Sequence, residues 1–213
     1  MNKKSSEQIK GILVLISYFL LPYLVKVLSI SKILVGTVYI LYSLILIYLY
    51  KETIINDIKY IKKNKTKCVK DIIINVLLLF VVVILINLII GLVLGIKETS
   101  SNDFSLVALF NKKPVIIVFL TCIYYPIVEG IVFRKSIRDV IDNKWFFIIF
   151  SSLIYFFFNI VYTNIDFNSI MTSICYFFSM IVLSNYYWRS KNFTSSVLIM
   201  MLYNVITTIL RLI

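Results

Sequence analysis

The sequence predicts an all-α, polytopic membrane protein with about seven transmembrane helices. Of its 213 residues 61% are hydrophobic, and the mean hydropathy of +0.96 is too high for a soluble domain of this length. Several runs of about 18 or more residues lack charge, and each could cross a hydrocarbon core of about 30 Å. These runs do not alternate apolar and polar positions, as the strands of a β-barrel would. We therefore expect helices embedded in a lipid bilayer.

Each expected helix corresponds to one apolar run. The first run is longer than the apolar core of a signal peptide and lacks a small-residue cleavage site, so we interpret it as a retained helix that Pro22 could kink. In the third run, Asn75 and Asn87 are expected to form interhelical hydrogen bonds. The runs are 11–28, 33–50, 72–96, 114–139, 145–162, 168–187 and 194–210.

Residues 51–71 form the longest polar connection and carry seven lysines. They are Lys51, Lys59, Lys62, Lys63, Lys65, Lys67 and Lys70. An amphipathic helix lying on anionic lipid would have this composition. A solvated loop would have much the same composition, so both interpretations stand.

The distribution of positive charge predicts the orientation of the chain. If the N-terminus is cytoplasmic, the cytoplasmic segments hold 16 of the 22 Lys and Arg residues, and the outer segments hold six. We therefore expect a multi-pass protein of the cell membrane with a cytoplasmic N-terminus, an outer C-terminus and a cytoplasmic 134–144 connection. Because membrane orientation explains the net charge of +12, we predict no nucleic-acid partner.

Cysteine and histidine usage limits the chemistry. Cys68, Cys122 and Cys175 form no CxxC pair, so neither a disulfide framework nor a zinc site is predicted. The chain has no histidine, which removes the commonest ligand of catalytic zinc and the commonest general base. We therefore predict no metal and no cofactor.

An acidic residue lies deep inside the fourth apolar run. Glu129 follows Pro126 and precedes Arg134. A carboxylate at the centre of a membrane helix costs about 2.5–3.5 kcal/mol on insertion scales, so its presence indicates a function. Pro126 has no N–H, which in an α-helix leaves the carbonyl of Cys122 unpaired.

Helix geometry places the partners of these charges on other helices. Glu129 and Arg134 are about 140° apart on an ideal helix, so we expect a polar site between helices. Alternatively, the helix ends early and both charges lie at the lipid headgroups. With the 134–144 connection in the cytoplasm, we expect Glu129 to lie within about 10 Å of the cytoplasmic end of its helix. Asn159, about 20 Å along the next helix, would then be deeper than Glu129, so either the fourth helix continues past Arg134 or the two helices are offset.

Three short segments follow one another at a characteristic spacing. Residues 129–134 read Glu-Gly-Ile-Val-Phe-Arg, residues 155–159 read Tyr-Phe-Phe-Phe-Asn, and residues 200–204 read Met-Met-Leu-Tyr-Asn. Their order resembles the Glu-Glu-x-x-x-Arg, Phe-x-x-x-His and His-x-x-x-Asn motifs of the CPBP family, the CAAX-protease and bacteriocin-processing membrane peptidases. The resemblance covers about residues 113–210.

The resemblance implies an intramembrane site in which glutamates and histidines activate water, directly or with a metal, while the last Asn stabilises the oxyanion. Glu129, Arg134 and Asn204 match the family and are the candidate catalytic residues. The degenerate positions are Gly130 for the second Glu, Tyr155 for the Phe, and Asn159 and Met200 for the two His. Neither an amide nor a thioether takes up a proton near neutral pH, and one carboxylate with one amide falls short of the three protein ligands of catalytic zinc.

Two domains are expected: residues 1–112, with three transmembrane helices and the basic 51–71 segment, and residues 113–213, a CPBP-like four-helix core. We expect a degenerate, bacterial family member that acts as a regulatory or bacteriocin-immunity-type partner of another membrane protein. The alternative is an active glutamate-dependent intramembrane endopeptidase for a membrane-associated peptide or a prenyl/CAAX-like substrate. A transporter would need more intramembrane charges. The polar stripes on the last helices could also serve packing alone.

Overall fold

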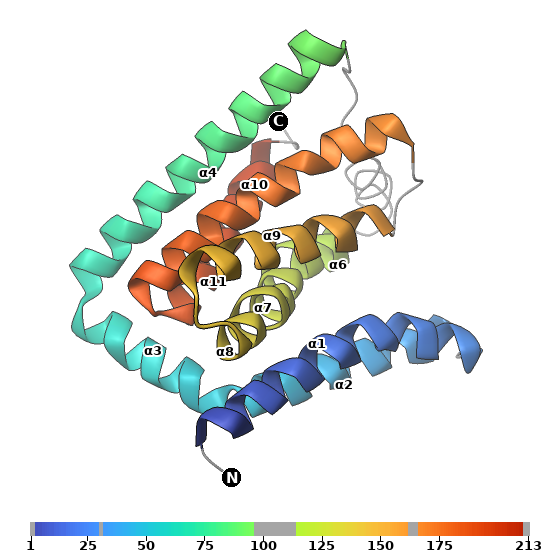
Figure 1. Cartoon of the computed structure of the whole chain (residues 1–213), viewed down its shortest axis with the longest axis vertical. Coiled ribbons are helices and arrows are strands. Elements are labelled where there is room, and N and C mark those ends of the chain that lie inside the picture. Colours follow the sequence, from blue (N-terminus) through green and yellow to red (C-terminus); the bar gives the residue numbers. More distant parts are fainter. Residues whose placement is uncertain (1–2, 30–31, 96–113, 162–165, 211–213) are drawn as a thin grey trace.

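A computed structural model describes residues 3–29, 32–95, 114–161 and 166–210 (Figure 1). Within these ranges the chain forms helices and no strand, which confirms the all-α prediction. The helices are α1 (Lys3–Val27), α2 (Lys32–Leu49), α3 (Lys51–Lys63), α4 (Lys65–Leu94), α6 (Pro114–Phe119), η1 (Leu120–Tyr124), α7 (Tyr125–Gly130), η2 (Ile131–Ser136), α8 (Ile137–Val140), α9 (Lys144–Val161), α10 (Phe167–Ser190) and α11 (Phe193–Leu210). The elements η1 and η2 are π-helical turns.

Six of the described helices are long and apolar enough to span a membrane. They are α1, α4, α9, α10, α11 and the helix from α6 to α8, Pro114–Val140, which we call the central helix. A seventh span results if α2 and α3, which meet at an angle of 66°, count as one bent pair. The chain is therefore a polytopic helical membrane protein. The sequence placed the start of the third long helix at position 72, but α4 begins at Lys65, because the basic residues there continue the helix.

The basic segments of the sequence gather at one end of the bundle. Lys4 at the N-terminus pairs with Asp142 in the loop after α8, with a distance of 2.6 Å from Nζ to Oδ2. Lys191, after α10, lines the same small pocket as Lys4. In α3, Asp57 Oδ2 accepts a hydrogen bond of 2.9 Å from the N–H of Thr194 at the start of α11. The four segments predicted to share one side of the membrane therefore do lie at the same end.

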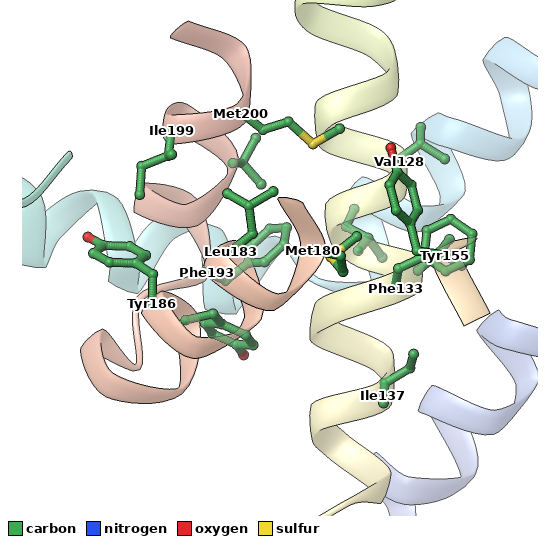
Figure 2. Close-up of a cluster of buried hydrophobic side chains, with 14 of the residues drawn as sticks. Val128, Phe133, Ile137, Tyr155, Met180, Leu183, Tyr186, Phe193, Ile199 and Met200 are labelled. Atoms are coloured by element: carbon green, nitrogen blue, oxygen red, sulfur yellow. The ribbon is translucent and has the colours of Figure 1, made fainter. Parts of the chain in front are cut away.

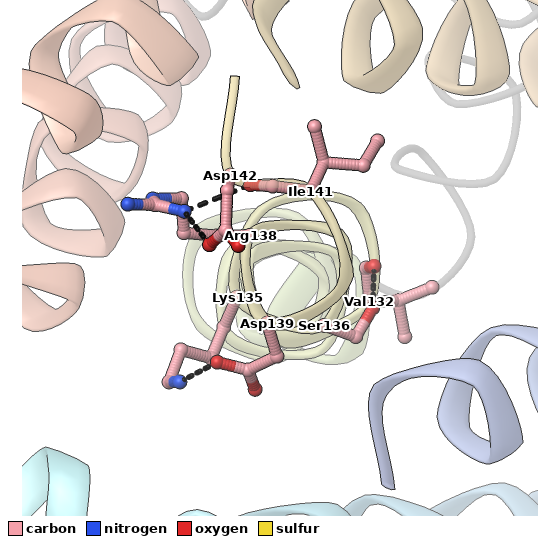
Figure 3. A network of polar contacts seen from close by, with 7 residues as sticks. All are labelled: Val132, Lys135, Ser136, Arg138, Asp139, Ile141 and Asp142. Atoms are coloured by element: carbon pink, nitrogen blue, oxygen red, sulfur yellow. Dashed lines mark hydrogen bonds and ion pairs between the residues drawn. The ribbon is translucent and has the colours of Figure 1, made fainter. Parts of the chain in front are cut away.

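The central helix continues beyond Arg134 and ends in a charged turn. Lys135 pairs with Asp139, and Arg138 Nη1 lies 3.6 Å from Asp142 Oδ1 and donates a hydrogen bond of 2.8 Å to the carbonyl of Ile141 (Figure 3). The helix continues through the Lys135–Asp139 pair and ends at Val140, so the alternative of an early end near Arg134 is wrong.

Helix α1 packs directly on the end of the central helix through a glycine. A Cβ atom on Gly11 would lie 2.5 Å from the carbonyl oxygen of Ser136 and 3.1 Å from Val140 Cγ2. Close contact between backbones through small residues is a common means of packing helices in membranes. Gly11 therefore allows α1 to cover the central helix.

The best-packed part of the bundle surrounds the central helix (Figure 2). Phe133 is fully buried, and its ring centroid lies 5.2 Å from that of Tyr155 on α9. Buried serines join the neighbouring helices: Ser151 on α9 donates to the carbonyl of Phe133, and its Oγ lies 3.0 Å from that of Ser184 on α10. Aromatic packing and hydroxyl hydrogen bonds thus fix α9 and α10 around the helix that carries Glu129.

The two asparagines of α4 behave differently. Asn87 Oδ1 accepts a hydrogen bond of 3.0 Å from Cys175 Sγ on α10, which confirms its predicted interhelical role. The bond that Asn75 donates goes instead to the carbonyl of Asp71, one turn back in its own helix.

Candidate functional site

Two π-helical turns flank the segment that carries Glu129. In the first, the N–H of Tyr125 donates to the carbonyl of Leu120, five residues earlier. In this register the next position would donate to the carbonyl of Thr121, but Pro126 has no N–H. Asn204 Nδ2 on α11 donates to that carbonyl at 2.7 Å. The expectation that Pro126 would release the carbonyl of Cys122 assumed an α-helical register; the π-turn shifts the affected carbonyl by one residue.

Glu129 is buried against α9. Only 8% of its surface is exposed, and its Oε2 accepts a hydrogen bond of 2.9 Å from the hydroxyl of Tyr155. The family motif has a phenylalanine where this chain has Tyr155, and phenylalanine has no hydroxyl. The hydrogen bond to Glu129 therefore depends on this substitution in the motif. The prediction that Glu129 finds a partner on another helix is confirmed.

The depths of these residues agree once the helix ends are known. Glu129 lies eleven residues before Val140 and Tyr155 lies eleven residues after Lys144, so both are about 16 Å from the same end of the bundle. The predicted depth of about 10 Å for Glu129 is wrong, because the central helix continues to Val140. Asn159 is one turn further along α9, where its Nδ2 donates a bond of 2.8 Å to the carbonyl of Tyr155.

Arg134 is a fully buried charge with few partners. Its Nη1 donates to Met200 Sδ on α11 at 3.7 Å, while Nε and Nη2 have no hydrogen-bond partner among the described residues. No ion pair within 4.0 Å joins it to Glu129, although the opposite charges attract at longer range. Met200, at a histidine position of the family, thus lies against a guanidinium group.

Gly130 allows α11 and Arg134 to approach the central helix. A Cβ atom at this position would lie 2.8 Å from Arg134 Nη2, 2.8 Å from Val197 Cγ2 and 3.2 Å from Phe193 Cε2. A π-turn pairs residues five apart, so η2 brings position 134 closer to the face of position 129 than an α-helix would. The guanidinium group therefore folds back over Gly130, where the family's second glutamate would begin.

The structure brings together some of the predicted site residues and separates others. Glu129, Arg134, Tyr155 and Met200 form one buried group next to Gly130, which we call the Glu129 cluster. Figure 2 shows the side chain of Met200 extending from α11 toward the central helix, and Tyr155 beside that helix. Asn159 and Asn204 each lie one turn away on their helices, and both side chains bind backbone carbonyls.

The Glu129 cluster does not fit a metal ion. It contains one carboxylate, and among the described residues no three His, Cys, Asp or Glu side chains lie close enough together to hold a metal. A catalytic zinc site normally has three protein ligands. The chemistry that the cluster can support is proton transfer at Glu129 and donation of hydrogen bonds from Tyr155 and Arg134.

Several residues of the site carry no sequence signal of their own. Val197 and Phe193 close the space beside Gly130, and Thr121 supplies the carbonyl that Asn204 binds. Apolar residues on a membrane helix look alike in sequence whether they face lipid or protein, so Val197 could not have been singled out. The π-turns also have no characteristic pattern, although the proline at position 126 is consistent with a local defect.

Comparison with known proteins supports the resemblance read from the motifs. Residues 111–206 match the family model described as Type II CAAX prenyl endopeptidase Rce1-like. This range includes all three motifs, from Glu129 to Asn204. No curated protein and no solved structure matches the chain. The protein is therefore a polytopic membrane protein whose residues 111–206 form an Rce1-like domain of the CPBP type.

Proposed function

We propose that this protein is a catalytically degenerate CPBP-family member that acts as a regulatory or immunity-type partner of another membrane protein. The observation that supports this proposal most directly is the packing around Gly130. The family's second glutamate is absent, and the space next to it is filled by Arg134, Val197 and Phe193.

The hydrogen bonds of the Glu129 cluster serve the fold. Peptide hydrolysis needs a base for the attacking water, donors for the oxyanion and an acid for the leaving amine. Glu129 is the single group of the cluster that can exchange a proton near neutral pH. Asn204, the family's oxyanion donor, already donates one of its two amide hydrogens to the carbonyl of Thr121. Met200 and Asn159 cannot replace the imidazoles.

The alternative is a glutamate-dependent intramembrane endopeptidase acting on a membrane-associated peptide or a prenyl/CAAX-like substrate. One observation favours it: Arg134 keeps two buried donors, Nε and Nη2, without a hydrogen-bond partner among the described residues. Such donors could stabilise an oxyanion, while Glu129 takes the proton from water. The proton would still have to reach the leaving amine from the same carboxyl group.

The proposed location is the cell membrane, with the N-terminus in the cytoplasm and the C-terminus outside. The support is the charge bias, since the end of the bundle that gathers Lys4, Asp57 and Lys191 also holds most of the chain's basic residues.

One experiment distinguishes the two functions. The purified full chain, reconstituted in vesicles, is incubated with prenylated CAAX-like peptides and with unmodified membrane peptides, and products are detected by mass spectrometry. For a degenerate protein we expect no cleavage, and cells carrying Glu129→Gln keep the phenotype of the parent. Cleavage that falls about 10²-fold or more in Glu129→Gln would instead establish a peptidase, because that is the usual effect of losing a general base.

A further inference from the structure

Helix α3 lies across the end of the bundle where the basic segments gather. It follows α2 with a bend of 66°, and none of its residues is fully buried (Figure 1). The helix connects α2 to α4 without continuing the direction of either. A helix of this kind, beside the ends of membrane spans, lies at the level of the lipid headgroups.

One face of α3 is fixed to the rest of the protein. Asp57 Oδ2 accepts the N–H of Thr194 at 2.9 Å, and the carbonyl of Asp57 accepts Nδ2 of Asn192 at 3.3 Å. Ile54, on the same face, packs against the hydrophobic core. These contacts define the orientation of α3 at the start of α11, so its remaining faces point in fixed directions.

A second face of α3 combines exposed apolar residues with lysines. At about 100° per residue, Ile55 and Ile58 share an edge with Lys51 and Lys62, about 100–160° around the helix from Asp57. Ile55 is 49% exposed and Ile58 is 39% exposed, and both lysines are exposed. An apolar edge flanked by lysines is typical of helices that lie in the membrane interface.

The first turns of α4, the helix that follows α3, carry a shallow groove. The groove is open to its surroundings and has a volume of about 630 Å³. The lining residues lie on one face of α4, with the polar residues at the beginning and the apolar residues toward the centre of the span. They are Lys65, Thr66, Val69, Lys70, Ile73 and Ile74. This order matches a lipid, whose charged headgroup lies above its acyl chain.

The charge of the surface indicates the sign of its ligand. All seven lysines between positions 51 and 71 are exposed, against three acidic residues, of which Asp57 is engaged with α11. Since Lys65 begins a 30-residue membrane helix, the surface lies beside the headgroups of the bilayer that the protein itself spans. We propose that α3 and the first turns of α4 form a docking surface for an anionic phospholipid, with its phosphate between Lys65 and Lys70 and an acyl chain along Ile73 and Ile74.

The test uses the full chain in detergent micelles supplemented with phosphatidylglycerol, with phosphatidylcholine of the same acyl chains, or with inorganic phosphate. The unfolding midpoint is measured at each concentration, and retained lipids are counted by native mass spectrometry. Phosphatidylglycerol should raise the midpoint and be retained, unlike the other two. A basic residue near a membrane surface contributes about 1 kcal/mol, or about 5-fold, so Lys65→Gln with Lys70→Gln should require about 30-fold more phosphatidylglycerol for the same shift.

The matched control is Lys26→Gln with Lys191→Gln, which neutralises two exposed lysines away from the groove and should respond as the parent does. An equal response to phosphatidylcholine, or an unchanged response of the Lys65 and Lys70 variant, would overturn the proposal. A shift with inorganic phosphate as large as that with phosphatidylglycerol would also overturn it, because the surface would then be a site for free anions. None of these outcomes depends on whether the protein is a peptidase.

Discussion

Replacing Tyr155 by Phe tests whether Glu129 is a buried charge that depends on one hydrogen bond. The substitution removes only the hydroxyl that donates to Glu129 Oε2 at 2.9 Å. Tyr155 is 6% exposed and Glu129 is 8% exposed, so bulk water cannot easily replace the lost donor. Hydrogen bonds to charged groups contribute about 1.5–3 kcal/mol. At about 2–4 °C per kcal/mol for a chain of this length, the unfolding midpoint should fall by about 3–12 °C.

The assay is thermal unfolding of the detergent-solubilised protein, arranged as a double-mutant cycle. Glu129→Gln keeps an acceptor oxygen but removes the charge, so Tyr155→Phe should cost less in that background, about 0.5–1.5 kcal/mol for a neutral bond. Tyr23→Phe, at a tyrosine that is 64% exposed, is the control and should leave the midpoint unchanged. A midpoint for Tyr155→Phe within about 1 °C of the parent would refute the reasoning. Equal losses in both backgrounds would show that the bond is not made to a carboxylate.

Three further predictions follow from the packing and the charges. In thermal unfolding, Gly130→Ala should destabilise the protein by about 1–3 kcal/mol through overpacking, and adding Val197→Ala should recover part of the loss. Gly36→Ala is the control and should be tolerated, because a Cβ atom at Gly36 would have no neighbouring atom within 4 Å. Burial raises the pKa of Asp57, while the hydrogen bond from the N–H of Thr194 opposes this shift. Because the folded pKa exceeds the unfolded pKa, the stability of the protein should decline as pH rises through the folded pKa, and Asp57→Asn should remove this decline in a pH series of unfolding midpoints. Asp57→Ala, which removes the acceptor of the Thr194 N–H, should cost about 1 kcal/mol of stability. Reporter fusions within α3 should report the cytoplasm and fusions at the C-terminus the outside; a cytoplasmic C-terminus would contradict both the orientation and the number of passes.

The helices could be predicted from the sequence because the bilayer imposes a simple rule on them. A span must be apolar over about 20 residues, and each apolar run of the described chain indeed forms a helix. The helix ends were harder to predict. The fourth run was expected to reach about position 139, yet the cytoplasmic connection was counted from Arg134; in the structure Lys135 pairs with Asp139 along a continuing helix that ends at Val140. This extension accounts for the error in the predicted depth of Glu129.

The motif spacing identified most residues of the site, and ideal helix geometry correctly indicated that Glu129 and Arg134 have their partners on other helices. Ideal geometry did not predict how close the two residues come, because five residues on an α-helix are separated by about 140°. The π-turn η2 alters that relation, and the guanidinium group of Arg134 lies over Gly130. Such turns depend on hydrogen bonds that tertiary packing supplies, as Asn204 does for Thr121. A pattern confined to one helix cannot reveal a defect that another helix stabilises.

The residue at position 130 therefore determines how closely α11 packs against the central helix. With glycine there, Val197 comes within contact distance of the backbone of the central helix, and Arg134 reaches Met200 across the same interface. A glutamate at this position would require Val197 and Phe193 to withdraw and Arg134 to turn away from Met200. Restoring a single family residue would thus disturb the packing before it could add a second carboxylate. The departures from the motif at positions 130 and 200 are coupled through Arg134, and they should be exchanged together in any attempt to restore the chemistry.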